Sequence, residues 1–222
     1  MIRFILLCCI TQFFACNAFA QATSLFNTIA NKPSLYKIKR AVAIAELTVV
    51  DNSGIKGNEN DTLNSGNVRK KLLYEYLSVS MPLKNTHISS RFGKRIDPIN
   101  GKMARHNGID LTANFEEAYA ILPGQIVKVG QDKRSGIYVT LKYSDYTVSY
   151  CHLSQPMVKK GEWVSPGDVV AITGNTGRST GPHLHLTTKF KGKAIDPTFL
   201  LDFVKETQGR AYEQLKQLDD IG

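Results

Sequence analysis

From Met81 onward, short apolar runs alternate with glycine and proline, and this pattern predicts the fold of most of the chain. Each run is rich in β-branched and aromatic residues and is only a few residues long, which is typical of strands rather than helices. Five such runs occupy residues 124–130, 136–143, 146–153, 167–173 and 183–190. Strands at this spacing, with a turn signal between successive runs, predict a mainly β protein with an antiparallel sandwich or barrel-like core.

The segments that flank the β-rich region carry helical patterns. Good helix formers fill residues 36–47, and apolar spacing predicts a short helix over residues 68–77. Between them, residues 51–67 are rich in Asn, Gly, Asp and Ser, which predicts a loop or linker. Residues 199–218 return to a helical pattern after a proline. We therefore expect an N-terminal helical or linker segment at 21–80, a β domain at 81–200, and a C-terminal helix or tail at 201–222.

The first twenty residues have the pattern of a secretory signal peptide. A basic start at Arg3 precedes an apolar run over residues 4–14, and Ala18-Phe19-Ala20 supplies a small-x-small cleavage site. The apolar run is too short to favour a transmembrane anchor, and acylation at Cys16 is the alternative. We expect a mature chain that is exported to the periplasm or cell envelope and has no transmembrane segment.

The cysteine content excludes a mature fold that is held together by internal disulfides. Three of the four cysteines lie in the predicted signal peptide, so the mature chain keeps only Cys151. Its fold must then rely on a hydrophobic core or on a metal. Cys151 precedes His152, which raises the question of a cysteine nucleophile. Strand alternation predicts that the Cys151 side chain points opposite to His152, away from any site, so we interpret it as a small buried residue.

The charge balance favours anionic partners. The chain carries 28 basic and 19 acidic side chains, a formal net charge of +9. A basic exported protein is attracted to anionic surfaces such as cell-wall polymers, lipid headgroups or nucleic acid. The sequence shows no pattern of stacking aromatic residues and lysines that is specific to nucleic acid. We therefore expect cell-wall polymers rather than nucleic acid as partners.

The histidines supply the candidate chemistry. Four of the five, His106, His152, His183 and His185, lie in the β-rich region. Residues two apart in a strand share a face, so His183 and His185 are expected to lie side by side. His106 and Asp110, four apart, are also good zinc ligands, although such a pair alone is weak evidence. Two histidines and one carboxylate leave a zinc position open, as in catalytic zinc sites, and the remaining histidines suit proton transfer.

Three stretches together resemble the signature of the lysostaphin-type zinc metalloendopeptidases of peptidoglycan. They are His106-Asn107-Gly108-Ile109-Asp110, Tyr150-Cys151-His152-Leu153 and Gly181-Pro182-His183-Leu184-His185. Residues 90–95 resemble the usual entry of that domain, and residues 175–180 resemble its Gly-rich turn before the last strand. The resemblance runs from about Met81 to about Leu200 in the family's order.

This resemblance implies a duplicated hybrid motif-like β core that holds one zinc ion per chain. It implies His106, Asp110 and His185 as zinc ligands, and His152 and His183 as catalytic histidines around the water and the scissile carbonyl. It also implies hydrolysis of peptide bonds in stem peptides or cross-links of bacterial peptidoglycan. Many members follow the last zinc histidine with an aromatic residue and a glutamate. Leu186-Thr187 stand there instead, which puts a contact to one of the histidines in doubt.

Two other functions are compatible with parts of the pattern. One is a non-enzymatic wall-binding module or activator of other wall hydrolases, a role in which related chains typically lose zinc ligands. The other is a lipoyl-like carrier, suggested by the Gly-rich hairpins, which leaves the histidines unexplained. Residues 21–80 can dock a partner, cover the groove or act as a tether.

Overall fold

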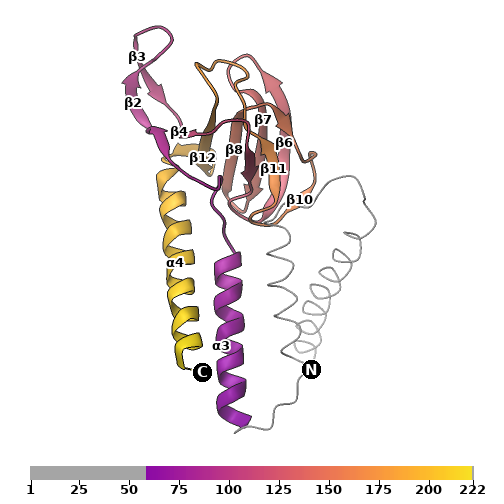
Figure 1. Ribbon diagram of the computed structural model, residues 1–222. Helices are drawn as coiled ribbons and strands as arrows, with labels where there is room; N and C mark the ends of the chain where they lie inside the picture. Colours follow the sequence, from indigo (N-terminus) through magenta and orange to yellow (C-terminus); the bar gives the residue numbers. More distant parts are fainter. Residues whose placement is uncertain (1–58, 222) are drawn as a thin grey trace. The chain divides into compact units, whose positions relative to one another are not determined.

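The computed structural model describes residues 59–221, which form two helices and a set of antiparallel strands (Figure 1). The predicted signal peptide, with its alternative acylation site at Cys16, and the predicted helix over residues 36–47 lie outside the described residues. The helices are α3 (Glu59–Leu77) and α4 (Thr198–Ile221). The strands are β1 (Ile88–Ser90), β2 (Gly93–Ile96), β3 (Met103–His106), β4 (Ile109–Thr112), β5 (Glu117–Tyr119), β6 (Gly124–Asp132), β7 (Gly136–Tyr143), β8 (Tyr146–Leu153), β9 (Gln155–Pro156), β10 (Trp163–Val164), β11 (Val169–Ile172), β12 (His183–Phe190) and β13 (Lys193–Ile195).

One large antiparallel sheet carries most of the domain. Its strand order is β1-β4-β12-β8-β7-β6-β10, with β13 paired to β12. A three-stranded sheet, β5-β11-β9, and a two-stranded hairpin, β2-β3, complete the described strands. Each of the five apolar runs predicted as strands coincides with a strand of this set, namely β6, β7, β8, β11 and β12. The prediction of a mainly β, antiparallel fold is therefore confirmed.

The two faces of the large sheet differ because side chains alternate along each strand. Leu184 and Leu186 of β12 are fully buried, and Leu111 of the adjacent β4 and Val139 of β7 belong to the same buried apolar cluster. The same buried cluster includes residues of β5 and β11, so it joins the two sheets. Threonine, serine, lysine and histidine side chains occupy the alternate positions, which makes the other face of the sheet polar.

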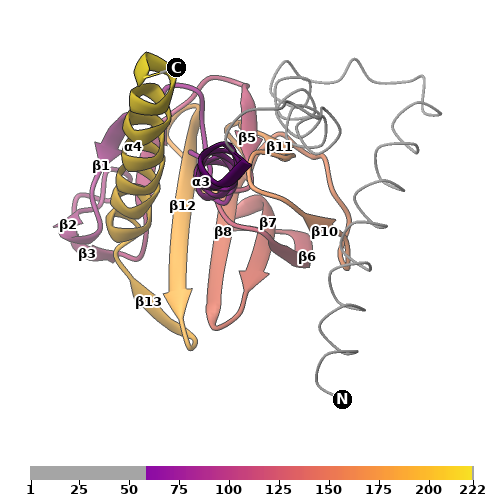
Figure 2. The same cartoon turned by 90° about the horizontal axis from the view of Figure 1, so that it is seen from below.

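The helices α3 and α4 lie side by side and run in opposite directions (Figures 1 and 2). Arg210 pairs with Glu75 at one end of this contact, and Arg69 pairs with Asp219 at the other. Helix α4 begins after Asp196, whose carboxylate accepts a hydrogen bond from the Thr198 N–H at 2.9 Å. The C-terminal helix and the short helix before the β domain are thus both present. Within residues 59–221, no helix is long and apolar enough to cross a membrane.

The prediction of a loop over residues 51–67 is wrong from Glu59 onward, because α3 begins there. Asn, Gly and Ser have low helix propensity, which is the signal the prediction followed. Propensity is a weak prior that tertiary packing overrides. Here the helix lies along α4, which provides a partner that the local sequence cannot reveal.

Truncation of Leu184 tests how far the domain depends on its apolar face. Leu184 is fully buried between the two histidines of β12, so Leu184→Ala removes core contacts and leaves a cavity. We expect the free energy of unfolding to fall by about 2–5 kcal/mol in chemical denaturation with a metal chelator present. Thr187→Ala, on the polar face of the same strand, is the control and is expected to cost less than about 1 kcal/mol. Equal losses for the two variants would contradict this account of the sheet.

Candidate metal centre

Strands β4 and β12 bring the first two candidate ligands together. His185 lies directly opposite Asp110 in the antiparallel register, and His183 lies opposite Thr112. Directly opposed residues have Cβ atoms about 5 Å apart, so the imidazole of His185 and the carboxylate of Asp110 meet. His106 ends β3 and reaches the same place from the chain entering β4. The pairing of strands therefore accounts for a site whose members are far apart in sequence.

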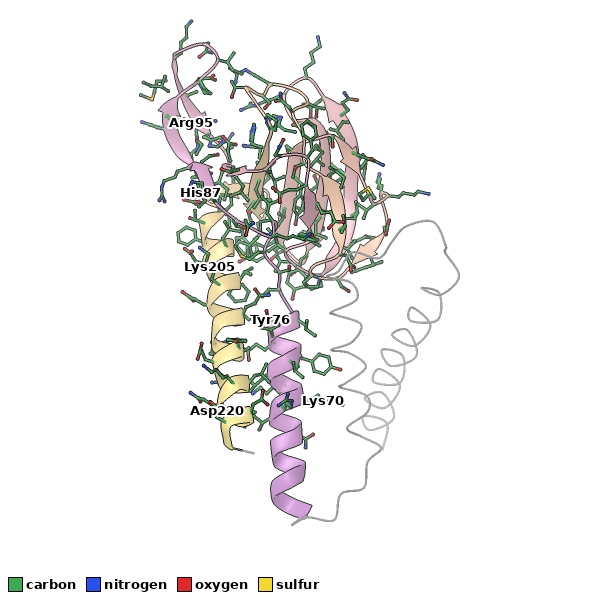
Figure 3. All side chains as sticks on the ribbon, in the orientation of Figure 1. Lys70, Tyr76, His87, Arg95, Lys205 and Asp220 are labelled. Atoms are coloured by element: carbon green, nitrogen blue, oxygen red, sulfur yellow. The ribbon has the colours of Figure 1, made fainter. Side chains whose placement is uncertain are left out.

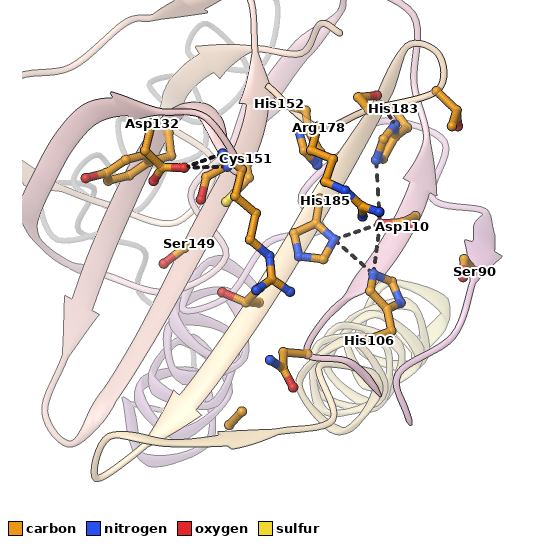
Figure 4. Close-up of a pocket in the computed structure, with 18 of the residues that line it drawn as sticks. Ser90, His106, Asp110, Asp132, Ser149, Cys151, His152, Arg178, His183 and His185 are labelled. Carbon is orange, nitrogen blue, oxygen red and sulfur yellow. Dashed lines mark hydrogen bonds and ion pairs between the residues drawn. The ribbon is translucent and has the colours of Figure 1, made fainter. Parts of the chain in front are cut away.

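Three donor atoms converge at this point (Figure 4). His185 Nδ1 lies 2.7 Å from Asp110 Oδ1, and His106 Nε2 lies 3.1 Å from His185 Nδ1 and 3.2 Å from Asp110 Oδ1. Two ligands about 2.0 Å from a tetrahedral zinc ion are separated by about 3.3 Å, so these spacings are close to those of a zinc site. Two imidazoles and a carboxylate are also a donor set that zinc prefers. The residues present therefore fit the metal that the sequence predicts.

The charge state of the carboxylate suits a ligand. Burial opposes ionisation of Asp110, but hydrogen bonds and charge attraction from His106 and His185 outweigh it and hold the pKa of the carboxyl well below its usual value. Its second oxygen, Oδ2, lies 3.3 Å from the Arg95 guanidinium. No spacing rule predicts this contact, because Arg95 lies on the separate β2–β3 hairpin (Figure 3).

Backbone carbonyls fix the orientation of three of the four histidines. His106 Nδ1–H donates to the Arg91 carbonyl at 2.8 Å, His152 Nδ1–H to the Thr176 carbonyl at 2.7 Å, and His183 Nδ1–H to the Gly181 carbonyl at 2.8 Å. A carbonyl can only accept, so Nδ1 carries a proton in each of these rings, and in the neutral ring the lone pair is on Nε2. Such contacts from outside the ligand set orient metal-site imidazoles. Arg91 contributes to the site through its main-chain carbonyl.

His152 and His183, which are not among the three converging donors, have further interactions. His183 also has the Ser179 hydroxyl 3.2 Å from Nδ1. Burial, which outweighs the hydrogen bond to Thr176, lowers the pKa of His152 to about 4, and repulsion from His183 and His185 adds to the effect. His152 is therefore neutral at neutral pH. Its ring centre lies 4.8 Å from that of His183 and 5.6 Å from that of His185.

A bulge in β8 turns His152 toward the site. Tyr150 pairs with Val139 and Leu153 pairs with Ile137, so two residues, Cys151 and His152, face a single residue of β7. His152 has φ = 60°, a left-handed conformation that is uncommon for a non-glycine residue and that breaks the alternation of the strand. Both side chains consequently point to the polar face.

The prediction that Cys151 points away from the site is wrong for this reason. Cys151 lies opposite His185 and lines the same groove as His152. Burial raises the pKa of its thiol to about 12, so the sulfur stays protonated at neutral pH. A thiol in this state is a poor nucleophile, which agrees with its interpretation as a buried packing residue.

The site opens into a groove of about 890 Å³. Its floor is the polar face of the large sheet, and its walls include the β2–β3 hairpin and the loop before β12. Arg178 of that loop donates to both carboxylate oxygens of Asp97, in the turn of the hairpin, at 2.8 Å each. This ion pair joins the two walls. The sequence did not identify Arg178, Ser179 or Asp97, because no spacing rule relates a hairpin turn to a loop 80 residues later.

Comparison with known proteins supports the interpretation of the β domain as one that holds a metal centre. Residues 104–197 match Peptidase family M23. The chain is 37% identical over 119 residues to an uncharacterized metalloprotease of Haemophilus influenzae, covering 51% of this chain and 25% of that protein. It is 37% identical over 112 residues to the peptidoglycan DD-endopeptidase ShyA of Vibrio cholerae, covering 49% and 26%. The chain thus spans about a quarter of the length of these curated relatives.

Two solved structures have a similar fold. A zinc-containing peptidase from Vibrio cholerae gives a TM-score of 0.50 at 32% identity, covering 54% of this chain and 39% of that one. The antimicrobial peptidase lysostaphin from Staphylococcus simulans gives a TM-score of 0.50 at 30% identity, covering 57% and 54%. The lysostaphin-type fold expected from the sequence is confirmed, and zinc is supported as the cofactor.

Replacement of Arg95 tests its contact with Asp110. Arg95→Ala removes the group that fixes Oδ2 of the carboxylate, and we expect zinc affinity to fall about tenfold or more in competition with a chromogenic chelator. Arg105→Ala is the matched control, because Arg105 lies on the same hairpin but stacks on Phe92 instead of contacting Asp110. Unchanged or tighter zinc binding in Arg95→Ala would show that the ion pair does not hold the carboxylate in place for the metal.

Proposed function

We propose that this chain, whose residues 104–197 match Peptidase family M23, is a zinc-dependent endopeptidase acting on bacterial peptidoglycan. The bond is a peptide bond in a stem peptide or cross-link. The observation that carries this proposal is the convergence of His106, Asp110 and His185 on the floor of an open groove, with His152 and His183 beside them. A buried metal with no groove would favour a structural role instead.

In this proposal His106, Asp110 and His185 would hold the metal. All three are at least half-buried, and metal binding requires only that His185 Nδ1 lose the proton it shares with Asp110. Zinc held by three protein ligands supplies a Lewis acid that polarises a carbonyl and acidifies water. Main-chain carbonyls orient the imidazoles of His106, His152 and His183. Arg95 contacts Asp110, which in turn contacts the imidazole of His185. The glutamate that is absent after His185 is therefore not needed to orient the three anchored histidines.

His183 and His152 are assigned to proton handling. Each has its Nδ1 proton engaged by a carbonyl, so each can take up a further proton only at Nε2. We assign the proton of the attacking water to His183 Nε2, which then carries an N–H that can pass to the leaving amine. His152, neutral because of its low pKa, accepts a hydrogen bond in the groove and orients the water or the substrate.

Substrate and location follow from the relatives and from the charge. The family includes proteins named as peptidoglycan DD-endopeptidases, which favours cleavage of cross-links. The net charge, +9 for the whole sequence and +8 without Arg3 of the proposed signal peptide, would hold the protein on anionic wall polymers. We assign residues 1–20 as the signal peptide, residues 81–200 as the peptidase domain, and the cell envelope as the location. The alternative of a non-enzymatic wall-binding module is weakened because the three proposed ligands and the two proposed catalytic histidines line one groove.

Paired measurements on purified protein test the function and the roles of the histidines. We expect wild type to bind one zinc ion per chain and to release soluble fragments from isolated peptidoglycan. His183→Ala should keep the zinc and lose fragment release by about a hundredfold or more, because it removes proton transfer but no ligand. His185→Ala should lose both. His87→Ala is the matched control, because His87 is exposed and does not line the groove, and it should behave as wild type.

Three results would count against the proposal. If His183→Ala also loses the zinc, then His183 is a ligand and the assignment of roles is wrong. If His183→Ala retains full activity, it takes no part in proton transfer. If wild type binds zinc but cuts no peptidoglycan, the chain is a binding module with an intact metal centre.

A further inference from the structure

The floor of the groove continues well beyond the metal centre. Cross-strand pairing aligns Lys128, Thr140, Ser149 and Thr187 in one row over β6, β7, β8 and β12. All four line the groove. His185 lies two residues before Thr187, so this row is about 7 Å from the metal ligands along the strand direction. A peptide that extends from the metal centre along the strands would therefore lie on a polar surface.

Hydroxyl groups form the middle of this row, and lysines flank it. The Thr140 and Ser149 hydroxyls lie 2.9 Å apart, so at least one of them retains a lone pair or proton for a ligand. Lys128 is at the β6 end of the row, and Lys189 lies two residues beyond Thr187 on β12. Both lysines are exposed and line the groove. We call these five residues the lysine-flanked row.

The positive charges of this row are not neutralised by the protein. Neither Lys128 nor Lys189 forms an ion pair with any residue in the described part of the chain. The carboxylates that line the groove are engaged elsewhere: Asp110 with the histidines and Arg95, and Asp132 with the N–H groups of Arg134 and Ser135. A cleft lined by charge of one sign attracts ligands of the opposite sign.

From these contacts we infer that the lysine-flanked row is a subsite for free carboxylates of an extended peptide. The inference rests on the proposed peptidase function and specifies its substrate. Lys189 lies four residues from His185, about 14 Å, and an extended peptide advances about 3.4 Å per residue. A carboxylate two to four residues from the scissile bond therefore reaches the row. Peptides whose carboxyl groups are amidated lose these ion pairs and bind more weakly.

Binding of two peptides tests the subsite. The probes are fluorescent peptidoglycan peptides of identical sequence, one with free carboxylates and one with carboxamides in their place. Affinities are measured by anisotropy on zinc-loaded, full-length protein carrying His183→Ala, so that turnover does not consume the probe. Two exposed ion pairs are expected to give the free acid about a tenfold preference. The preference should shrink as salt is added, because the lysines are exposed.

The variants separate a local subsite from overall charge. Lys128→Gln with Lys189→Gln should bring the affinity for the free acid down to that of the carboxamide, while the affinity for the carboxamide stays the same. Lys193→Gln with Lys205→Gln removes the same charge outside the groove, with Lys205 on α4 (Figure 3), and should keep the preference. No preference in the parent protein, a preference that survives the first pair, or an equal loss in both pairs overturns the inference.

Hydrolysis by the protein with His183 intact tests the proposed function separately. Cleavage of the free-acid peptide at higher kcat/KM than the carboxamide, with the difference lost in Lys128→Gln with Lys189→Gln, supports both the function and the subsite. If neither peptide is cut, the proposed function fails for these substrates, and the binding preferences alone decide the subsite. Failure of one is therefore distinguishable from failure of the other.

Discussion

The antiparallel pairing of β4 with β12 is the constraint on which the site depends. It sets His185 opposite Asp110, and alternation along the same strand places His183 on the same face. A slip of one residue in this register would move both histidines into the apolar core and Leu184 and Leu186 into the groove. The buried leucines oppose such a slip, because exposing them costs free energy. The hydrophobic core thus specifies the chemistry by specifying the register.

His152 is held by a different device. Regular alternation would direct it into the core, and the bulge in β8 reverses its direction at the expense of a left-handed backbone conformation. Such conformations persist where the surroundings determine them, and they cluster at functional sites. Its N–H donates to the Ser135 carbonyl and its ring to the Thr176 carbonyl, so two loops fix the residue from either side. The strain is located where the proposed chemistry needs an imidazole that the sheet alone would not supply.

The sequence predicted the strands and the candidate residues, and it failed where contacts are long-range. Apolar runs of strand length located β6, β7, β8, β11 and β12, because burial of one sheet face imposes the pattern. The His-x-His spacing placed His183 and His185 on one face for the same reason. Alternation misplaced Cys151, since a bulge leaves no mark in the residue pattern. The contacts of Arg95 and Arg178 join segments that only the folded chain brings together, as does the extension of α3 along α4.

The β2–β3 hairpin makes two contacts, one at the metal centre and one across the groove, and together they bear on two binding equilibria. It ends in His106 and presents Arg95 to Asp110, and Asp97 in the turn of the hairpin is joined to Arg178 across the groove. In the proposed enzyme, this one element would support both the zinc ion and the bound peptide. The two binding equilibria would then be linked, and such linkage is reciprocal. A peptide that binds better with the hairpin in this position would raise the affinity for zinc, and loss of zinc would lower the affinity for the peptide by the same factor.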